Sequence, residues 1–157
     1  MEPNWLQVAT LAASIVAPFV SAKLAVHYAL RRFSSEKRWE RKAETYASLL
    51  EALHHMKNHS EVYMKHELRD SEPSEDQKRE LAEIFHRAHS EVRKRADIGN
   101  FAISDDAAIA LLTLEKDLSE SGDVQLGWWG HLQLENDAID KCLSAIREIA
   151  KKDLGFE

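Results

Sequence analysis

Residues 5–22 read WLQVATLAASIVAPFVSA, eighteen consecutive residues without an ionisable side chain in a chain of 157 residues that is 31% charged. With the following residues to Leu30 the segment has 26 residues, about 39 Å of helix, which exceeds a hydrocarbon core of about 30 Å. Trp5 and Tyr28 stand where interfacial aromatic residues stand in membrane helices. We therefore predict a single transmembrane helix within an anchor of residues 1–30, followed by a helical domain over residues 31–157.

Two other interpretations of this apolar segment stay open. Val20-Ser21-Ala22 resembles a signal-peptidase cleavage site, but Glu2 is the only charged side chain before the segment, whereas signal peptides begin with positive charge. Pro18, Lys23 and His27 would also fit a helix buried in a protein core. The absence of charge from residue 5 to residue 22 favours the membrane span over both.

The flanking charges predict an orientation. Before the segment there is no Lys or Arg, and immediately after it six occur in residues 31–42: Arg31, Arg32, Lys37, Arg38, Arg41 and Lys42. Because positively charged flanks stay in the cytoplasm, we predict the N-terminus outside and the helical domain in the cytoplasm. The same membrane-proximal basic residues can contact anionic lipid headgroups, although a simple topology signal explains them equally well.

Composition limits what the remaining chain can do. Residues 43–157 hold 14 Lys or Arg against 24 Asp or Glu, a net charge of −10, so we expect no nucleic-acid partner. The single cysteine, Cys142, excludes an internal disulfide and a thiol metal site. Neither a Gly-rich phosphate loop nor a G-x-S-x-G elbow is present, and we expect no cofactor.

Periodicity predicts an all-α fold of five helices, the four after the span forming a four-helix bundle. Few glycines and prolines interrupt the chain, and nothing clearly stops the first helix before the second one, about 34–69. The others are expected at about 75–98, 105–119 and 131–152, with Ser74 and Ser104 as N-caps, a turn at Ser121-Gly122-Asp123, and the last helix following Gly127-Trp128-Trp129-Gly130. Apolar residues predicted to face a core are Trp39, Tyr46, Leu49, Leu53, Met56 and Tyr63, then Leu81, Ile84, Phe85, Ala88, Val92 and Ala96, then Leu132, Leu134, Ala138, Ile139, Cys142, Leu143, Ile146 and Ile149.

Polar residues recur on one face of the predicted span. Gln7, Thr10, Ser14 and Ser21 follow one another at steps of three, four and seven, and we include Lys23 at the cytoplasmic end. Small and polar residues on one face of a membrane helix are typical of helix–helix contact. A single-pass chain must make that contact with another chain, so we predict a homo-oligomer, either a packed anchor or a ring whose polar faces line a pore.

The histidines suggest a metal site only weakly. Glu51 with His54, and Glu83 with His86, have the E-x-x-H spacing of di-iron bundles, but the further inward glutamates of such sites are not recognisable. The pair His55 and His59 has zinc-ligand spacing without a third ligand. We expect solvated or capping histidines and no metal.

A second weak candidate is the sequence RELAEIFH, residues 79–86, in which Arg79 and His86 are seven residues apart. This spacing resembles the Arg–His signature of the HEPN ribonucleases, helical proteins that dimerise to build their site. The resemblance implies that His86 acts on the ribose 2′-hydroxyl and Arg79 on the phosphate. The alternative is an ordinary ion pair of Arg79 with Glu83 or Glu75, at helical spacing on the same helix.

Three longer segments carry a broader resemblance: residues 31–59 (RRFSSEKRWERKAETYASLLEALHHMKNH), 92–108 (VRKRADIGNFAISDDAA) and 142–155 (CLSAIREIAKKDLG). They resemble blocks of small bacterial proteins with one N-terminal span and a cytoplasmic helical domain, and this resemblance implies that the span lies in the bacterial inner membrane. The layout is similar to that of the membrane accessory proteins of type VI-B CRISPR systems, which implies a HEPN-like bundle that assembles in membranes during antiphage defence.

The expected function is therefore that of a non-enzymatic, self-associating membrane protein that forms a pore or perturbs the membrane. Two alternatives from other classes stay open. One is a membrane-tethered HEPN-like ribonuclease, and the other is a passive scaffold that recruits a cytosolic protein partner through its acidic helices.

Overall fold

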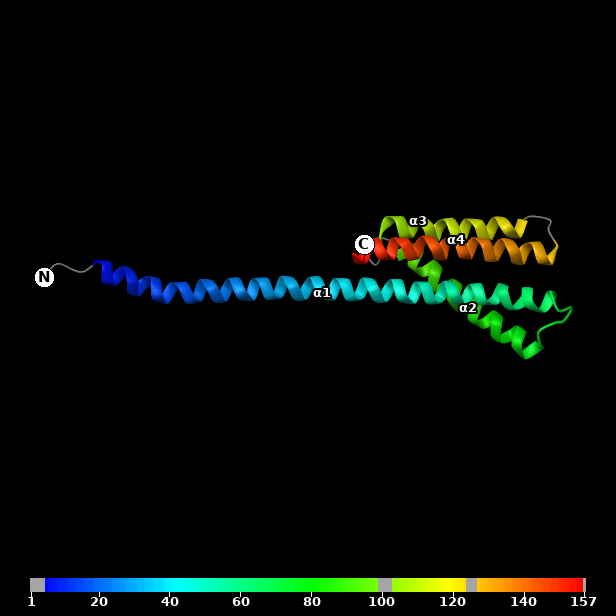
Figure 1. The fold of residues 1–157 in the computed structure, drawn as a ribbon, viewed down its shortest axis with the longest axis horizontal. Coiled ribbons are helices and arrows are strands. Elements are labelled where there is room, and N and C mark those ends of the chain that lie inside the picture. Colours follow the sequence, from blue (N-terminus) through cyan, green and yellow to red (C-terminus); the bar gives the residue numbers. More distant parts are fainter. Residues whose placement is uncertain (1–4, 99–102, 124–126, 157) are drawn as a thin grey trace. The chain divides into compact units, whose positions relative to one another are not determined.

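The computed structural model describes residues 5–98, 103–123 and 127–156, which form four helices and their connections (Figure 1). Side chains are described from residue 23 onward, except at residues 24, 34 and 121–123. The helices are α1 (Trp5–Glu67), α2 (Glu75–Ile98), α3 (Asp105–Asp123) and α4 (Trp128–Leu154). These described residues contain no strand, so the prediction of an all-α protein is confirmed.

The segment expected to hold the first two helices is one helix, α1, which reduces the five expected helices to four. No Gly or Pro occurs between residues 19 and 72, so nothing forces the backbone out of the helical conformation there. Two ion pairs at helical spacing stabilise the helix where the first two expected helices would have met. Arg32 pairs with Glu36 at 3.0 Å, and Lys37 pairs with Glu40 at 2.7 Å.

Within the part of the chain whose side chains are described, no helix contains a stretch long and apolar enough to cross a membrane. The segment Trp5–Ala22, from which we predicted the span, lies outside that part.

The chain divides into two compact units, Met1–Glu40 and Arg41–Glu157. The second unit is a helical bundle, which confirms that prediction. Its core combines residues from all four helices, and the helical stripes identified from periodicity supply most of them. The fully buried side chains include Leu49, Leu53 and Met56 of α1, Val92 of α2, Leu111 and Leu114 of α3, and Leu132, Ile139 and Ile146 of α4.

Two serines begin helices as predicted. The Ser74 hydroxyl accepts a hydrogen bond from the Gln77 amide at 3.2 Å, and the Ser104 hydroxyl accepts one from the Ala107 amide at 3.4 Å. At the other end, α4 stops at Gly155, whose φ of 74° is in the left-handed region that glycine adopts without a steric penalty. The caps therefore fix where the helices of the bundle begin and end.

Helix α4 begins at Trp128, three residues earlier than predicted. Gly127 is its N-cap in an extended conformation, so the Gly-Trp-Trp-Gly sequence supplies the cap and first residues of the helix instead of preceding it. The turn predicted at Ser121-Gly122-Asp123 is wrong, because α3 continues through these residues to Asp123. The Trp128 ring meets the Tyr63 ring edge-on at 5.7 Å between centroids, and this contact holds the first turn of α4 against the end of α1.

Candidate functional site

An exposed apolar stripe runs along α1 within the unit Met1–Glu40. Val26, Leu30 and Phe33 are 58, 62 and 60% exposed, and their steps of four and three place them on one face of the helix. The ammonium of Lys37, four residues further on, lies 5.9 Å from the centre of the Phe33 ring. Tyr28, 69% exposed, is on the opposite face. The surface of the helix between Val26 and Phe33 thus exposes apolar side chains on two opposite faces, and Lys37 places a positive charge next to it.

The predicted basic residues of this unit lie on the same part of α1. Arg31, Arg32, Lys37 and Arg38 are exposed, and Glu36 and Glu40 are the only acidic residues among them. The ion pairs that these two glutamates make with Arg32 and Lys37 are exposed, and such pairs contribute little to stability because solvent and salt screen them. Four cationic and two acidic side chains give this part of the helix surface a net positive charge.

Arg41 and Lys42, counted with the same basic group, begin the second unit. Arg41 is exposed, whereas the ammonium of Lys42 lies 3.0 Å from the carboxylate of Asp153 in α4. Its partner is 111 residues away in the sequence, so charge counting alone does not reveal this role. Lys42 belongs to the bundle rather than to a free basic surface.

The predicted polar face of the span is beyond what the structure tests. The side chains of Gln7, Thr10, Ser14 and Ser21 lie outside the described residues. Lys23 is described and exposed. A step of two residues in an α-helix turns about 200°, so Lys23 does not share a face with Ser21, and its inclusion with that face is wrong on helix geometry.

A cluster of half-buried polar residues surrounds the buried Tyr46, which we predicted only as an apolar core residue. Its hydroxyl donates a hydrogen bond to the Asp153 carboxylate and lies 3.2 Å from the Ser104 hydroxyl and 3.3 Å from the Ser104 amide, which donates to it. Burial, and after it the bond to Asp153, raises the pKa of Tyr46. Burial also acts to raise the pKa of Asp153, but hydrogen bonds from Tyr46, Lys42 and Ser104 outweigh it and hold that pKa below its usual value.

Two histidine–glutamate pairs join helices elsewhere in the bundle. His59 Nδ1 lies 3.3 Å from a Glu135 oxygen that also accepts a 2.6 Å hydrogen bond from the fully buried Ser60 hydroxyl. His89 Nε2 lies 2.9 Å from Glu115. The Phe85 ring stands against both imidazoles, with centroids at 4.7 Å from His59 and 5.9 Å from His89. Sequence patterns at helical spacing cannot reveal pairs of this kind, because each one joins two different helices.

The E-x-x-H pairs do not converge. Glu51 lies 3.9 Å from His55 instead of engaging His54, and His86 is exposed with its ring edge-on to Phe85. Among the described residues there is no group of three or more His, Cys, Asp or Glu side chains placed to hold a metal ion.

Arg79 and His86 are both exposed on α2. The guanidinium of Arg79 pairs with the Asp76 carboxylate at 2.8 Å, an ion pair on the same helix. Seven residues of helix rise by about 10 Å, so within one chain the two side chains do not form a single site. A catalytic role would need both residues from a second copy as well, and it stays a prediction.

Cys142 is buried, and its thiol points to the Ala110 carbonyl oxygen at 3.7 Å. Burial, with a smaller contribution from Asp117, raises the pKa of the thiol to about 12. The thiolate is the reactive form of cysteine, so Cys142 is a core residue and not a nucleophile.

Comparisons with family models, with curated proteins and with solved structures find no match to this chain. The resemblances drawn from its sequence segments stay predictions.

Proposed function

We propose that this chain is a membrane-anchored, self-associating helical protein of the bacterial inner membrane that acts by assembling its N-terminal segment into a pore. Its bundle lies in the cytoplasm, and its role is in the defence against phage that the segment resemblance implies. The observation that carries the proposal is the exposed apolar stripe of Val26, Leu30 and Phe33 next to exposed basic residues on the same helix.

The stripe supports attachment to a bilayer. Exposed apolar side chains at helical spacing are costly in water, at about 25 cal/mol per Å² of apolar surface. They continue an apolar segment of eighteen residues without charge, and the basic residues follow where headgroups would meet the helix. The three features together are those of a helix that leaves the hydrocarbon core and enters the cytoplasm.

Self-association follows from the helix register. On an α-helix that includes residue 5 to residue 67, positions 7, 10, 14 and 21 are on the side opposite to positions 26, 30 and 33. In the proposed arrangement, the apolar stripe faces lipid and the polar positions face other copies. Because those positions carry Gln, Thr and Ser, a ring of such helices encloses a polar passage.

The test compares two triple variants of the full-length protein. Gln7, Thr10 and Ser14 are changed to Leu in one variant, and Val8, Ala12 and Ile15 are changed to Leu in the matched control, which alters the opposite face. Native mass spectrometry in mild detergent gives the copy number, and dye release from liposomes gives the permeability. The wild type and the control should form a closed ring of several copies and release dye.

The polar-face variant should stay inserted, as shown by resistance to alkaline extraction, but lose dye release and shift to fewer copies. A wild-type protein that is monomeric in detergent, or one that is extracted from membranes at alkaline pH, would contradict the proposal. A dimer without conductance would instead direct attention to the composite Arg79 and His86 site, with RNA cleavage as the assay.

A further inference from the structure

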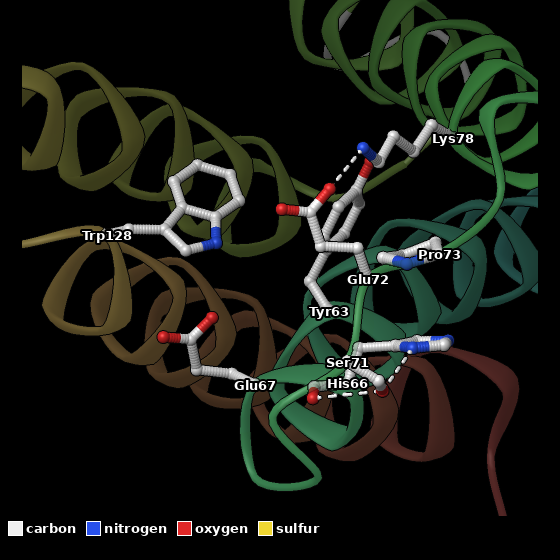
Figure 2. Close-up of a pocket in the computed structure, with 8 residues that line it drawn as sticks. All are labelled: Tyr63, His66, Glu67, Ser71, Glu72, Pro73, Lys78 and Trp128. Carbon is white, nitrogen blue, oxygen red and sulfur yellow. Dashed lines mark hydrogen bonds and ion pairs between the residues drawn. The ribbon is translucent and has the colours of Figure 1, made fainter.

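A cavity of about 250 Å³ lies at one end of the bundle, where the last turns of α1, the connection to α2, the first turns of α2 and the first residue of α4 come together (Figure 2). All of its lining residues belong to the unit Arg41–Glu157. Ligand cavities in proteins usually start at about 300 Å³, so a cavity of this size suits a small molecule or a single side chain.

Two aromatic rings form one wall of the cavity. The rings of Tyr63 and Trp128 have their centroids 5.7 Å apart and their planes at 88°, so they form a corner (Figure 2). Trp128 remains 54% exposed, an unusual state for the largest apolar side chain. Aromatic faces attract cations through the ring quadrupole, and tryptophan does so most strongly.

The charged residues of the cavity favour the same kind of ligand. The carboxylate of Glu67 lines the cavity near Trp128 and has no hydrogen-bond or ion-pair partner among the residues that the structure describes (Figure 2). The one ammonium in the lining, that of Lys78, is held by Glu72 at 2.8 Å and by Glu75 at 3.0 Å. The lining thus holds two carboxylates, Glu67 and Glu72, and one ammonium, a formal charge of −1 that repels an anion, and Glu75 beside it adds a further negative charge.

The cavity is already shaped without a ligand. The chain turns sharply after α1, with Asp70 at φ 47°, and Ser71 closes the turn through hydrogen bonds from its amide at 3.0 Å and from its hydroxyl at 3.3 Å to the His66 carbonyl oxygen. Pro73 is buried, and Ser74 caps α2 directly after it. A site that does not have to be ordered on binding loses less affinity to conformational entropy.

We propose that this cavity binds the ammonium group of an organic amine. In the proposed complex the ammonium lies in the corner of Tyr63 and Trp128 and pairs with Glu67, and an unbranched apolar stem fills the remaining space. The chemistry is that of a free small amine or of a lysine side chain of another protein. The inference does not depend on membrane attachment or on pore formation.

The experiment uses the full-length protein in detergent micelles with 5-fluorotryptophan, so that each of its four tryptophans gives a ¹⁹F signal. The signals are assigned by replacing one Trp with Phe at a time. Butylammonium is titrated first, and butanol serves as its neutral counterpart. We expect butylammonium to shift the Trp128 signal saturably, with a dissociation constant on the order of 1 mM, while butanol does not.

Glu67→Gln provides the decisive comparison, because it removes the charge and keeps the size of an exposed side chain. It should weaken binding about fivefold, while Glu44→Gln, an exposed glutamate of α1 outside the cavity, should leave binding unchanged. Absence of a saturable Trp128 shift, or an equal affinity of Glu67→Gln and wild type, would overturn the proposal.

A lysine with blocked amino and carboxyl ends distinguishes the two sources of the ammonium. Binding at least as tight as that of butylammonium supports a lysine side chain of a partner protein. Binding about tenfold weaker supports a free amine, because the peptide groups then do not fit around the cavity entrance.

Discussion

The hydroxyl of Tyr46 in α1 donates a hydrogen bond to the carboxylate of Asp153 in the last turn of α4, across 107 residues of sequence. The same hydroxyl accepts a hydrogen bond from the Ser104 amide, and Lys42 pairs with the same carboxylate. One half-buried polar cluster thus connects the start of the bundle portion of α1 with the start of α3 and the end of α4. We expect the stability of the bundle to depend in part on these hydrogen bonds, in addition to the apolar core contacts of α1.

Replacing Tyr46 with Phe tests this dependence. The ring can remain in the core, but Asp153 and Ser104 lose a partner in a buried place, so the free energy of unfolding should fall by about 2 kcal/mol. The urea midpoint of the full-length protein in mild detergent, followed by near-UV circular dichroism, measures the change. Tyr63→Phe is the control, because the Tyr63 hydroxyl makes no hydrogen bond within the described part of the chain. Equal midpoints for the two variants would contradict the expectation.

The lowered pKa of Asp153 predicts how stability changes with pH. Since that pKa is lower in the folded chain than the value of about 3.9 expected when unfolded, the ionised carboxylate stabilises the fold. The contribution is complete above about pH 5 and is lost as the pH falls through the folded pKa. Wild type should therefore lose stability more steeply than Asp153→Asn between about pH 5 and pH 3.

Urea unfolding at several pH values gives both slopes. Asp137→Asn, on the exposed face of the same helix, should keep the wild-type slope. Parallel slopes for wild type and Asp153→Asn would show that the Asp153 carboxylate does not stabilise the fold by being charged.

Hydrophobic periodicity was sufficient to predict the helices and most of the core. Leu49, Leu53 and Met56 recur at helical spacing and are fully buried. The starts of α2 and α3 were predictable because Ser74 and Ser104 precede acidic first turns. The same reasoning fails for Leu134, which is 39% exposed although it was grouped with the core residues of α4.

The polar contacts could not be predicted in the same way. Glu135, Glu115 and Asp153 look like ordinary solvated carboxylates in the sequence, because their partners Ser60, His89 and Tyr46 are on other helices. Trp39 was predicted to be buried and is not. It continues the apolar spacing of Tyr46 but is 46% exposed, since it belongs to the unit that ends at Glu40.

Cys142 should be inert in the folded protein. Its thiol is buried and has a pKa of about 12, so at pH 8 almost none of it is the reactive thiolate. Maleimide labelling followed by mass spectrometry should be negligible in buffer and complete in urea. Ser90→Cys in a Cys142→Ala background places a thiol on the exposed surface of α2 and should label quickly. Rapid stoichiometric labelling of the folded wild type would mean that α3 and α4 separate readily around Cys142.

The hydrogen bond from Ser60 to Glu135 predicts a strong coupling between these two residues. Glu135→Leu removes the acceptor of a fully buried hydroxyl, so the free energy of unfolding should fall by about 1–3 kcal/mol. Glu135→Gln keeps an amide oxygen as acceptor and should cost less. Adding Ser60→Ala to Glu135→Leu removes the unsatisfied hydroxyl. The double variant should therefore lose less free energy of unfolding than the two single variants lose together.

Urea unfolding of the four proteins in this cycle gives the coupling energy, which we expect to be about 1 kcal/mol. A serine within a helix can also donate to the backbone carbonyl four residues earlier. If Ser60 does so as soon as Glu135 is removed, the two substitutions will be additive within about 0.5 kcal/mol. Additivity would therefore mean that Glu135 is not needed to satisfy Ser60.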